Sequence, residues 1–293
     1  MDNITISVII PTFNSIKHIE KCLNSVYSQS KPADEIIVVD DGSNDETCKL
    51  IQEKYPKVRI VKQENSGPAK ARNNGVSVAS CKYIAFLDSD DFWDEEHLKN
   101  LSSVFYSYPH IKWAATPYKI HEKNKIILIQ PHISQGVIQY FDFAYKTPFV
   151  WTGCVMFETE AIRSLNGFNE IYSRGEDIDL WFRFAMKFPL TGITTSPTAN
   201  YIKSSLSLTN KRSSPDIFVS RINNTISYML NSDKPYHTGA VKLINIWIRK
   251  LLVEILKKKQ WNTVRNLKVP KTLLNSNNKA LISFCKLFSK NSE

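Results

Sequence analysis

Glycine is scarce in this chain of 293 residues, which contains nine of them. They form neither a G-x-G-x-x-G pattern nor a G-x-x-x-x-G-K-[ST] pattern. Loops of these two kinds bind phosphate groups through their backbone amides. The absence of both patterns indicates that any bound phosphate is neutralised by side chains or by a cation.

Cysteine is also sparse, and long apolar runs are missing. The five cysteines are scattered and none belongs to a C-x-x-C pair, which argues against a zinc site or a disulfide framework and favours a reducing cytosol. No run of 18 apolar residues marks a membrane span. Because the first residues, Met-Asp-Asn, lead almost directly into a β-rich run, we expect no secretory signal and a cytoplasmic location.

Positive charge is unevenly distributed along the chain. The formal net charge is +10, yet residues 1–210 hold 22 Lys or Arg against 24 Asp or Glu, which gives −2. Residues 211–293 hold 16 against 4, which gives +12. Such a split indicates two regions with different partners. We therefore divide the chain into a domain of residues 1–210 and a basic, mostly helical extension of residues 211–293.

Apolar runs and amphipathic segments alternate through the first hundred residues. This alternation predicts βαβ units, and hence an α/β fold with a mainly parallel sheet flanked by helices. The expected strands lie at 4–10, 36–39, 58–61 and 83–87, and the expected helices at 15–29, from about 45, at 68–79 and at 94–107. Later segments predict a hairpin of 112–120 with 125–129, a strand at 149–157, and helices at 158–166, 215–230, 238–259 and 278–288.

Polar side chains gather where three of these strands end. Because the carboxyl ends of parallel strands meet at one edge, where such sheets bind ligands, the three groups are expected to converge. The acids of the last group suit Mg²⁺ or Mn²⁺, ions that usually bridge to substrate phosphates. The alternative is a solvated helix N-terminus, with the acids facing the helix dipole. The three groups are Pro11-Thr12-Phe13-Asn14, Asp40-Asp41-Gly42-Ser43 and Asp88-Ser89-Asp90-Asp91.

Five motifs, in this order and spacing, resemble those of family 2 glycosyltransferases with a GT-A fold. The resemblance covers roughly residues 4–210. It implies the transfer of a sugar from a nucleotide-sugar to an acceptor hydroxyl, with inversion at the anomeric carbon. The motifs are Ser7-Val8-Ile9-Ile10-Pro11-Thr12-Phe13-Asn14, Ile37-Val38-Val39-Asp40-Asp41-Gly42-Ser43, Asn65-Ser66-Gly67-Pro68-Ala69-Lys70-Ala71-Arg72-Asn73-Asn74-Gly75, Phe86-Leu87-Asp88-Ser89-Asp90-Asp91 and Gly175-Glu176-Asp177-Ile178-Asp179-Leu180.

The first four motifs imply a donor site. By resemblance, Asp90 is the direct ligand of Mg²⁺ or Mn²⁺ and Asp88 lies near that metal and the ribose, so that the cation neutralises the departing diphosphate. Asp41 resembles the acid that bonds the base, which suits a uracil imide. The alternatives are an Asx turn for Asp41, an exposed helix charge for Arg72 and a helix cap for Asp91. The nucleotide-sugar-binding residues implied are Pro11, Thr12, Phe13, Asp40, Asp41, Arg72, Asp88 and Ser89.

The fifth motif implies the acceptor side. Asp177 is the candidate general base for the acceptor hydroxyl. Glu176 is expected to hold the loop or touch the acceptor, and Trp181 to stack on a sugar. The alternatives are helix N-terminal acids favoured by the dipole and, for Trp181, a core aromatic.

One departure from the family lies at residues 201–207. Relatives often carry a His or Arg there, whereas this chain reads Tyr201-Ile202-Lys203-Ser204-Ser205-Leu206-Ser207. Lys203 could contact the pyrophosphate in place of the missing His or Arg. A role for this segment as a closing loop therefore does not follow from the resemblance.

The basic extension lies outside the five motifs. A basic helical region with an apolar stripe favours binding of residues 238–290 to an anionic membrane surface. That surface would be the inner face of the plasma membrane, and it would suit an acceptor on a lipid carrier. The alternative is a helical cap with a solvated basic face. In the expected helix the cations Lys242, Arg249, Lys250 and Lys257 lie away from Ile244, Ile248, Leu251 and Ile255.

Together these features predict a metal-dependent inverting glycosyltransferase. The expected donor is a UDP-sugar, the expected acceptor a saccharide or lipid-linked saccharide, and the expected product a bacterial surface polysaccharide or lipopolysaccharide. One alternative is a sugar-phosphate nucleotidyltransferase, although a Gly-rich loop is usual where Pro11-Thr12-Phe13-Asn14 stands. Another is a non-catalytic protein that binds glycan or membrane. Nucleic-acid binding is not expected, because the charge behind the pI of 9.2 sits in an extension without recognition motifs.

Overall fold

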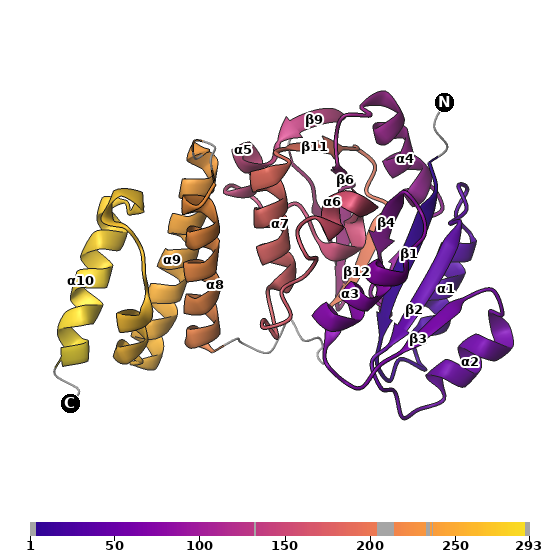
Figure 1. The fold of residues 1–293 in the computed structure, drawn as a ribbon, viewed down its shortest axis with the longest axis horizontal. Helices are drawn as coiled ribbons and strands as arrows, with labels where there is room; N and C mark the ends of the chain where they lie inside the picture. Colours follow the sequence, from indigo (N-terminus) through magenta and orange to yellow (C-terminus); the bar gives the residue numbers. More distant parts are fainter. Residues whose placement is uncertain (1–3, 132, 204–213, 233–234, 236, 291–293) are drawn as a thin grey trace. The chain divides into compact units, whose positions relative to one another are not determined.

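The main sheet has eight strands in the order β3-β2-β1-β4-β10-β6-β11-β9 (Figure 1). The computed structural model describes residues 4–131, 133–203, 214–232, 235 and 237–290. Neighbours from β3 to β4 are parallel, β10 runs antiparallel to both β4 and β6, and β11 is parallel to β6 but antiparallel to β9. The strands are β1 (Ile6–Thr12), β2 (Glu35–Asp40), β3 (Arg59–Lys62), β4 (Tyr83–Phe86), β6 (Trp113–Ala115), β9 (Gly136–Gln139), β10 (Val155–Glu158) and β11 (Leu190–Ile193).

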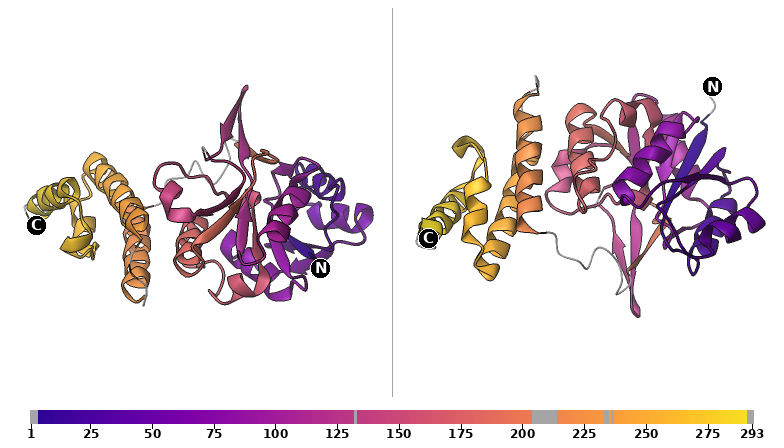
Figure 2. Two further views of the ribbon diagram at one scale, coloured as in Figure 1. Left: turned by 90° about the horizontal axis from the view of Figure 1, so that it is seen from above. Right: turned by 60° about the horizontal axis from the view of Figure 1, so that its bottom comes forward.

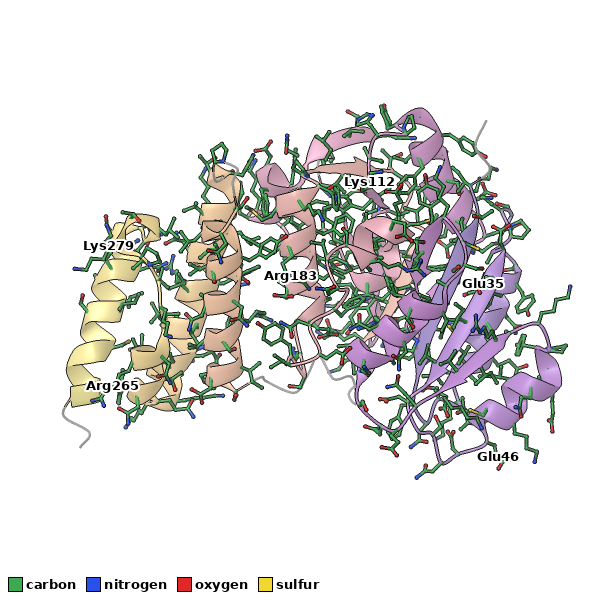
Figure 3. The ribbon with its side chains drawn as sticks, in the orientation of Figure 1. Glu35, Glu46, Lys112, Arg183, Arg265 and Lys279 are labelled. Carbon is green, nitrogen blue, oxygen red and sulfur yellow. The ribbon has the colours of Figure 1, made fainter. Side chains whose placement is uncertain are left out.

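The parallel half of the sheet follows the sequence prediction closely. Every residue of β1 is buried, as expected for a β-rich strand covered on both faces. Thr12 pairs with Asp40, and Ile9 pairs with Phe86, so β1, β2 and β4 end at the same edge. Figure 3 labels Glu35 at the start of β2 and Glu46 just beyond its other end, which places this carboxyl edge at the bottom of that view.

Helix α3 packs directly on the middle of the sheet. Gly75 permits this, because a Cβ there would lie 2.4 Å from Cγ2 of Ile9. The helices around the sheets are α1 (Ile19–Tyr27), α2 (Thr47–Lys54), α3 (Pro68–Val78), α4 (His97–Ser107), α5 (Tyr140–Ala144), α6 (Thr159–Arg163) and α7 (Glu176–Lys187), together with the 3-10 helix η1 (Thr152–Cys154).

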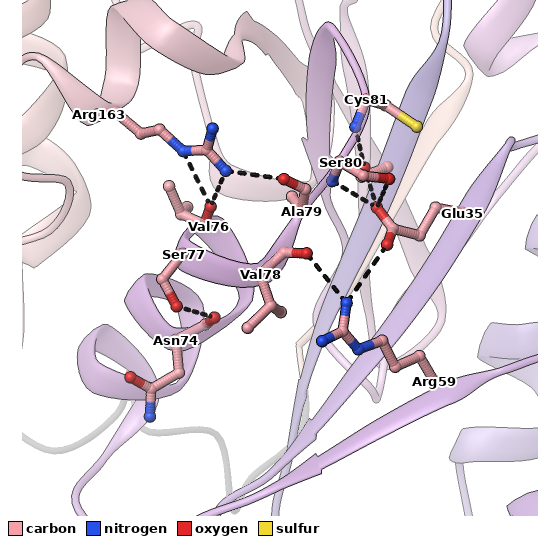
Figure 4. Close-up of polar contacts among 11 residues, drawn as sticks. Glu35, Arg59, Asn74, Val76, Ser77, Val78, Ala79, Ser80, Cys81 and Arg163 are labelled. Atoms are coloured by element: carbon pink, nitrogen blue, oxygen red, sulfur yellow. Dashed lines mark hydrogen bonds and ion pairs between the residues drawn. The ribbon is translucent and has the colours of Figure 1, made fainter.

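The C-terminal end of α3 is held by two arginines (Figure 4). Arg163 donates to the carbonyl of Val76 at 2.9 Å and to that of Ala79 at 2.7 Å, and Arg59 donates to the carbonyl of Val78 at 3.1 Å. The last carbonyls of a helix lack partners within it, and cations there also oppose the negative end of the dipole. These contacts fix α3 so that its N-terminus lies at the carboxyl edge of the sheet.

A second sheet has four strands in the order β5-β12-β7-β8. The sequence predicts one strand over 112–120, but the structure divides it: β6 joins the main sheet, and β7 pairs with β8 around a turn at Lys123, where φ is 51°. Figure 2 shows the β7–β8 hairpin projecting from the rest of the first unit. The strands are β5 (Phe92–Trp93), β7 (Tyr118–Glu122), β8 (Lys125–Ile129) and β12 (Ala199–Lys203).

The region from 149 to 157 also differs from its prediction. Instead of one long strand, a 3-10 turn at η1 precedes the short strand β10. Phe157 of β10 then enters an aromatic core, where its ring stacks on Trp113 at 5.9 Å and on Trp181 at 5.2 Å.

The contacts between residues divide the chain into two compact units. The first contains Met1–Tyr140 and Pro148–Ser207, and the second contains Phe141–Thr147 and Leu208–Glu293. The boundary expected at residue 210 lies within 204–213, outside the described residues. Residues 141–147, which the sequence analysis leaves in the first region, belong to the second unit.

Three helices form the frame of the second unit. The side chain of Asn245, on the second of these helices, binds the segment that leads into the third. It donates to the carbonyl of Leu273 at 2.7 Å and accepts from the amide of Asn275 at 2.9 Å. In the part of the chain that the structure describes, no helix is long and apolar enough to cross a bilayer. The elements are α8 (Pro215–Leu230), α9 (Thr238–Lys258), α10 (Ser276–Lys290), η3 (Trp261–Asn266) and η4 (Lys271–Leu273).

Candidate active site

The three polar groups predicted from the sequence meet at the carboxyl edge of the parallel strands. The carbonyl of Thr12 accepts the amide of Asp41 at 2.8 Å, which joins the first group to the second. The hydroxyls of Ser15 and Ser89 lie 2.7 Å apart, which joins the loop after β1 to the acidic loop after β4. Phe13 is 48% exposed at this edge, so an apolar ring faces outward where three strands end.

Asp41 fixes the start of α3. Its Oδ1 accepts the amide of Ser66 at 2.7 Å and the Gln63 side chain at 2.8 Å, and its Oδ2 accepts the amide of Gly67 at 2.9 Å. The Asx-type turn falls to Asp40 instead, whose carboxylate accepts the amide of Ser43 at 3.1 Å. A buried carboxylate with three donors is well satisfied, and it locates α3 relative to β2.

Arg72 connects the donor-side motifs to the acceptor-side motif. Its Nη2 lies 2.7 Å from Asp88 at the end of β4, and its Nη1 lies 2.9 Å from Glu176 at the start of α7. Burial alone would lower the pKa of Arg72, but Asp88 and then Glu176 raise it above its ordinary value. The guanidinium is buried, so the alternative of an exposed helix charge is wrong.

The acidic loop after β4 holds more negative charge than Arg72 balances. Burial and then the charge of Asp88 raise the pKa of Asp90 to about 6. Burial, followed by Asp90 and Asp88, raises the pKa of Asp91 well above its ordinary value. Burial and like charge both disfavour ionisation, so this loop would be relieved by an added cation.

Asp91 is not the cap of the next helix. Its Oδ1 accepts the amide of Ile202 on β12 at 2.6 Å, and α4 begins only at His97. Its Oδ2 is buried and finds no hydrogen-bond partner among the described residues. Asp91 therefore ties the second sheet to the acidic loop.

The donor set of this loop fits a hard divalent cation. Carboxylate oxygens suit Mg²⁺ and Mn²⁺, and Mg²⁺ is usually held by one or two carboxylates with phosphate and water oxygens completing the shell. Within the described ranges, no group of three His, Cys, Asp or Glu side chains is arranged to hold a metal ion. A site here would thus depend on Asp88 and Asp90 together with oxygens of the substrate.

Helix α7 carries the acids predicted for the acceptor side. It begins after Gly175, whose φ of 78° is left-handed and suits glycine. Asp177 is half-buried, and its Oδ1 accepts the amide of Ile178 at 2.7 Å. Burial and then the negative charge of Asp177 raise the pKa of the Tyr140 phenol. Asp177 therefore lies at the start of α7 and is only partly open to solvent.

Asp179 and Arg183 hold α7 in place. Arg183, labelled in Figure 3, contacts Asp179 at 2.8 Å and donates to the carbonyls of Leu165 at 2.9 Å and Gly167 at 2.8 Å. Of the three acids at this helix start, Asp179 thus pairs with Arg183 and Glu176 pairs with Arg72, so both contribute to the scaffold.

Two expectations about individual side chains need correction. Trp181 is 2% exposed and stacks on Phe157, so it is a core aromatic and its faces are not open to a sugar. Lys203 lies 2.8 Å from Glu122 across β12 and β7, which gives it a partner within the second sheet. Residues 204–207 of the departing segment lie outside the described residues.

An aromatic group formed by Trp151, Tyr118 and Tyr201 was not anticipated. Trp151 lies against Tyr118 and Tyr201, with ring centroids 5.6 and 5.2 Å apart. The three residues come from separate parts of the chain, and the sequence analysis treats 149–157 only as a strand. The one local signal is Gly153, two residues after the tryptophan, since a Cβ there would lie 2.2 Å from the Trp151 ring.

Comparisons with known proteins agree with this geometry. The family model described as "Glycosyl transferase family 2" matches residues 7–165. An uncharacterised glycosyltransferase of Rickettsia conorii is 32% identical over 240 residues, which are 79% of this chain and 38% of the relative. The minor teichoic acid biosynthesis protein GgaA of Bacillus subtilis is 32% identical over 193 residues, 62% of this chain and 43% of that protein. The chain thus spans well under half the length of these relatives.

A solved structure shows the same fold. The crystal structure of residues 1–349 of S. aureus TarS in complex with UDP-GlcNAc superposes with a TM-score of 0.82 at 18% identity, over 98% of this chain and 88% of that one. This likeness identifies the architecture as a GT-A fold.

Proposed function

The chain belongs to glycosyl transferase family 2, and on that basis we propose that it moves a sugar from a nucleotide-sugar to an acceptor hydroxyl, with inversion. The observation that carries the proposal is the double ion pair of Arg72. It holds Asp88 of the donor motif and Glu176, the neighbour of Asp177, within reach of one buried guanidinium. Acids 88 positions apart in the chain therefore belong to one site.

The donor would bind along the carboxyl edge of β1, β2 and β4. The exposed ring of Phe13 supplies an apolar surface for the base, beside Pro11 and Thr12. Asp40 and Asp41 lie next to it, and Asp41 retains acceptor capacity for a base N–H beyond its three bonds. An imide such as that of uracil offers such a donor, which favours UDP as the nucleotide. Arg72, Asp88 and Ser89 lie further along the edge, on the diphosphate side.

A divalent cation, Mg²⁺ or Mn²⁺, would be held by Asp90 and Asp88 and would supply charge neutralisation for the departing diphosphate. Burial and then the charge of Asp88 raise the pKa of Asp90, and a cation bound there would favour its ionised form. Without it, one guanidinium faces Asp88, Asp90 and Asp91.

Asp177 would accept the proton of the attacking hydroxyl. An inverting displacement needs one base on the side opposite the leaving group, in contrast to the two carboxylates of glycosidases. Glu176, the residue before Asp177, is paired with Arg72, and Asp179 is paired with Arg183. These ion pairs keep Glu176 and Asp179 from accepting that proton. Asp177, half-buried at the start of α7, would then be the base.

The proposed process is the synthesis of a cell-surface polysaccharide. The name of GgaA refers to teichoic acid biosynthesis, and a further relative is a chondroitin synthase of Escherichia coli, 28% identical over 193 residues. Both names concern polymers of a cell surface. The acceptor would be a saccharide or a lipid-linked saccharide. The polymer would be a surface polysaccharide or a lipopolysaccharide.

The second unit would hold the protein at the inner face of the plasma membrane. On α9 the exposed cations Lys242, Arg249, Lys250 and Lys257 follow one another at spacings of seven, one and seven residues and share one face. Val253, which is 36% exposed, lies among them. Mixed cationic and apolar faces bind anionic bilayers, at about 1 kcal/mol per cation near the surface.

Co-sedimentation with vesicles tests this surface. Vesicles with phosphatidylglycerol should retain the protein at low salt, and replacing the four cations by Gln should release it. Replacing Lys49, Lys54 and Lys70, exposed cations of the first unit, should change little. Equal binding of all variants would contradict the assignment.

The central experiment measures nucleoside diphosphate release from a panel of sugar nucleotides with Mn²⁺ or Mg²⁺. Asp177→Asn should bind donor as the wild type does but transfer at least 100-fold more slowly. Asp90→Asn should lose metal-dependent donor binding. The matched control is Asp216→Asn, an exposed acid on α8, which should leave both unchanged.

The alternatives give different results in the same assay. A sugar-phosphate nucleotidyltransferase would release pyrophosphate from a nucleoside triphosphate and a sugar phosphate. A non-catalytic protein would bind glycan or membrane and turn over no donor. Normal turnover by Asp177→Asn would remove that residue from the role of base.

A further inference from the structure

One face of the second sheet carries two tyrosines beside the Lys203–Glu122 ion pair, and we call it the aromatic face. Side chains alternate along a strand, and the register pairs Tyr118 with Ala199 and Ile120 with Tyr201, so both tyrosines lie on the same face of β7 and β12. Trp151 covers that face at 5.2–5.6 Å from the two rings. On the opposite face, Lys119 and Asn200 both contact Asp94. The aromatic face is therefore a distinct surface of this small sheet.

The indole of Trp151 is held in position by its own loop. Its ring packs over Gly153, where any Cβ would lie 2.2 Å away. The carbonyl of Gly153 accepts the Trp93 indole N–H at 2.6 Å, and the amide of Cys154 donates to the carbonyl of Trp151 at 3.0 Å. Yet Trp151 and Tyr201 are only half-buried, unlike Trp113 and Trp181 in the core. A fixed and partly open aromatic surface is what ring stacking needs.

This surface adjoins the acidic loop. The amide of Ile202, next to Tyr201, is bound by Asp91 at 2.6 Å. The 3-10 turn η1, which follows Trp151, contacts both β4 and β12, and Gly153 of this turn binds the Trp93 indole just beyond the acidic loop at 2.6 Å. The charge of Asp177 contributes, after burial and Cys154, to the raised pKa of Tyr118. A molecule lying on Trp151 would thus adjoin the acidic loop, with Tyr118 within electrostatic reach of Asp177.

We propose that Trp151 and Tyr201 form a stacking platform for a pyranose ring of the acceptor, which presents its hydroxyl to Asp177. This inference rests on the proposed function and names the side chains that bind its second substrate. The C–H faces of a pyranose are apolar and weakly positive, and they complement the negative face of an aromatic ring. Sites for small polar ligands are commonly lined in this way, with a few polar groups fixing the orientation.

The platform replaces the role expected of Trp181. That side chain lies on α7 beside the base but is enclosed by Phe157 and Phe168. Trp151, the residue before η1, lies instead against Tyr118 and Tyr201 and is only half-buried. The aromatic acceptor residue is thus supplied by a different element.

Saturation-transfer NMR with a panel of methyl β-pyranosides, with gluco, galacto and 2-acetamido configurations, tests the platform without any turnover. The wild type should transfer saturation to the ring protons of at least one glycoside. Trp151→Ala should abolish this transfer and Trp151→Phe should keep part of it. Gly153→Ala should also lose it, because the added methyl displaces the ring. Tyr106→Ala, which removes a 52% exposed aromatic on α4, should behave as the wild type.

Kinetics give a second readout. Trp151→Ala should raise the KM for the acceptor at least tenfold, while slow hydrolysis of the donor by water stays within twofold of the wild type. Equal saturation transfer in the wild type and Trp151→Ala, or none in the wild type, would overturn the inference. Loss of donor hydrolysis in a folded Trp151→Ala would overturn it too, since it would place the residue on the donor side. If the wild type releases no nucleoside diphosphate from any donor, the proposed function fails, and the NMR result still decides the platform.

Discussion

Replacing Arg72 by Met tests whether one buried cation holds the site together. The side chains of Arg72, Glu176 and Asp88 are 5%, 11% and 26% exposed. Removing one partner of a buried ion pair costs roughly 3–5 kcal/mol, because the other charge is left without compensation. Here two carboxylates lose the same partner, but Asp88 is partly hydrated. We therefore expect a loss of about 3–4 kcal/mol in the free energy of unfolding, a large share of the roughly 5–15 kcal/mol typical of a domain.

Urea unfolding followed by circular dichroism measures this loss. Arg72→Lys keeps the charge but lacks the planar fork that reaches both acids, so it should lose about half as much. In the double variant with Glu176→Gln, the loss should be smaller than the sum of the single losses by roughly 1–3 kcal/mol, as for groups in direct contact. Turnover should fall with stability, since Glu176 adjoins Asp177.

The matched control is Arg59→Met. Arg59 is 53% exposed, lies 3.7 Å from Glu35 and donates to the carbonyl of Val78 at 3.1 Å. An exposed pair contributes at most about 1 kcal/mol and a hydrogen bond about 1 kcal/mol, so this variant should lose about 2 kcal/mol at most. If Arg72→Met cost no more than Arg59→Met, the guanidinium would not be what joins the donor and acceptor motifs, and the reasoning above would be refuted.

Two further predictions concern the scaffold. Burial lowers the pKa of His97 from 6.5 to about 3, so the unfolded chain binds the proton first as pH falls. The free energy of unfolding should therefore decrease between pH 6.5 and 3, by up to about 1.4 kcal/mol per pH unit. Urea unfolding at pH 7.5 and 5.5 should show a smaller pH dependence in His97→Gln than in the wild type, and an equal dependence would contradict the prediction. Gly75→Ala should lower the free energy of unfolding by about 1–3 kcal/mol because its Cβ would lie 2.4 Å from Ile9. The control, Ser77→Ala on the exposed side of α3, should change the urea midpoint little. Equal midpoints for the two variants would show that the sheet accommodates the added methyl group.

The order of the motifs determined the parallel half of the fold. Short-range patterns suffice there, because an apolar run of four to seven residues followed by a turn and an amphipathic helix predicts a βαβ unit from neighbouring residues alone. The convergence of Thr12, Asp40 and Asp88 then follows from the shared direction of parallel strands. The same patterns fail at 112–120, where one apolar stretch serves two sheets and only long-range pairing selects the break.

The chemical identity of the site was readable from the sequence, but the partner of each side chain was not. Aspartates at strand ends and at the start of a glycine-preceded helix indicate an acidic site whatever their exact contacts. That Arg72 bridges Asp88 and Glu176, that Trp181 is enclosed while Trp151 is half-open, and that Lys203 is paired with Glu122 depends on which surfaces the helices and sheets bury against each other. Burial and pairing are properties of the packed chain, and packing brings together residues whose sequence separation carries no signal of their contact.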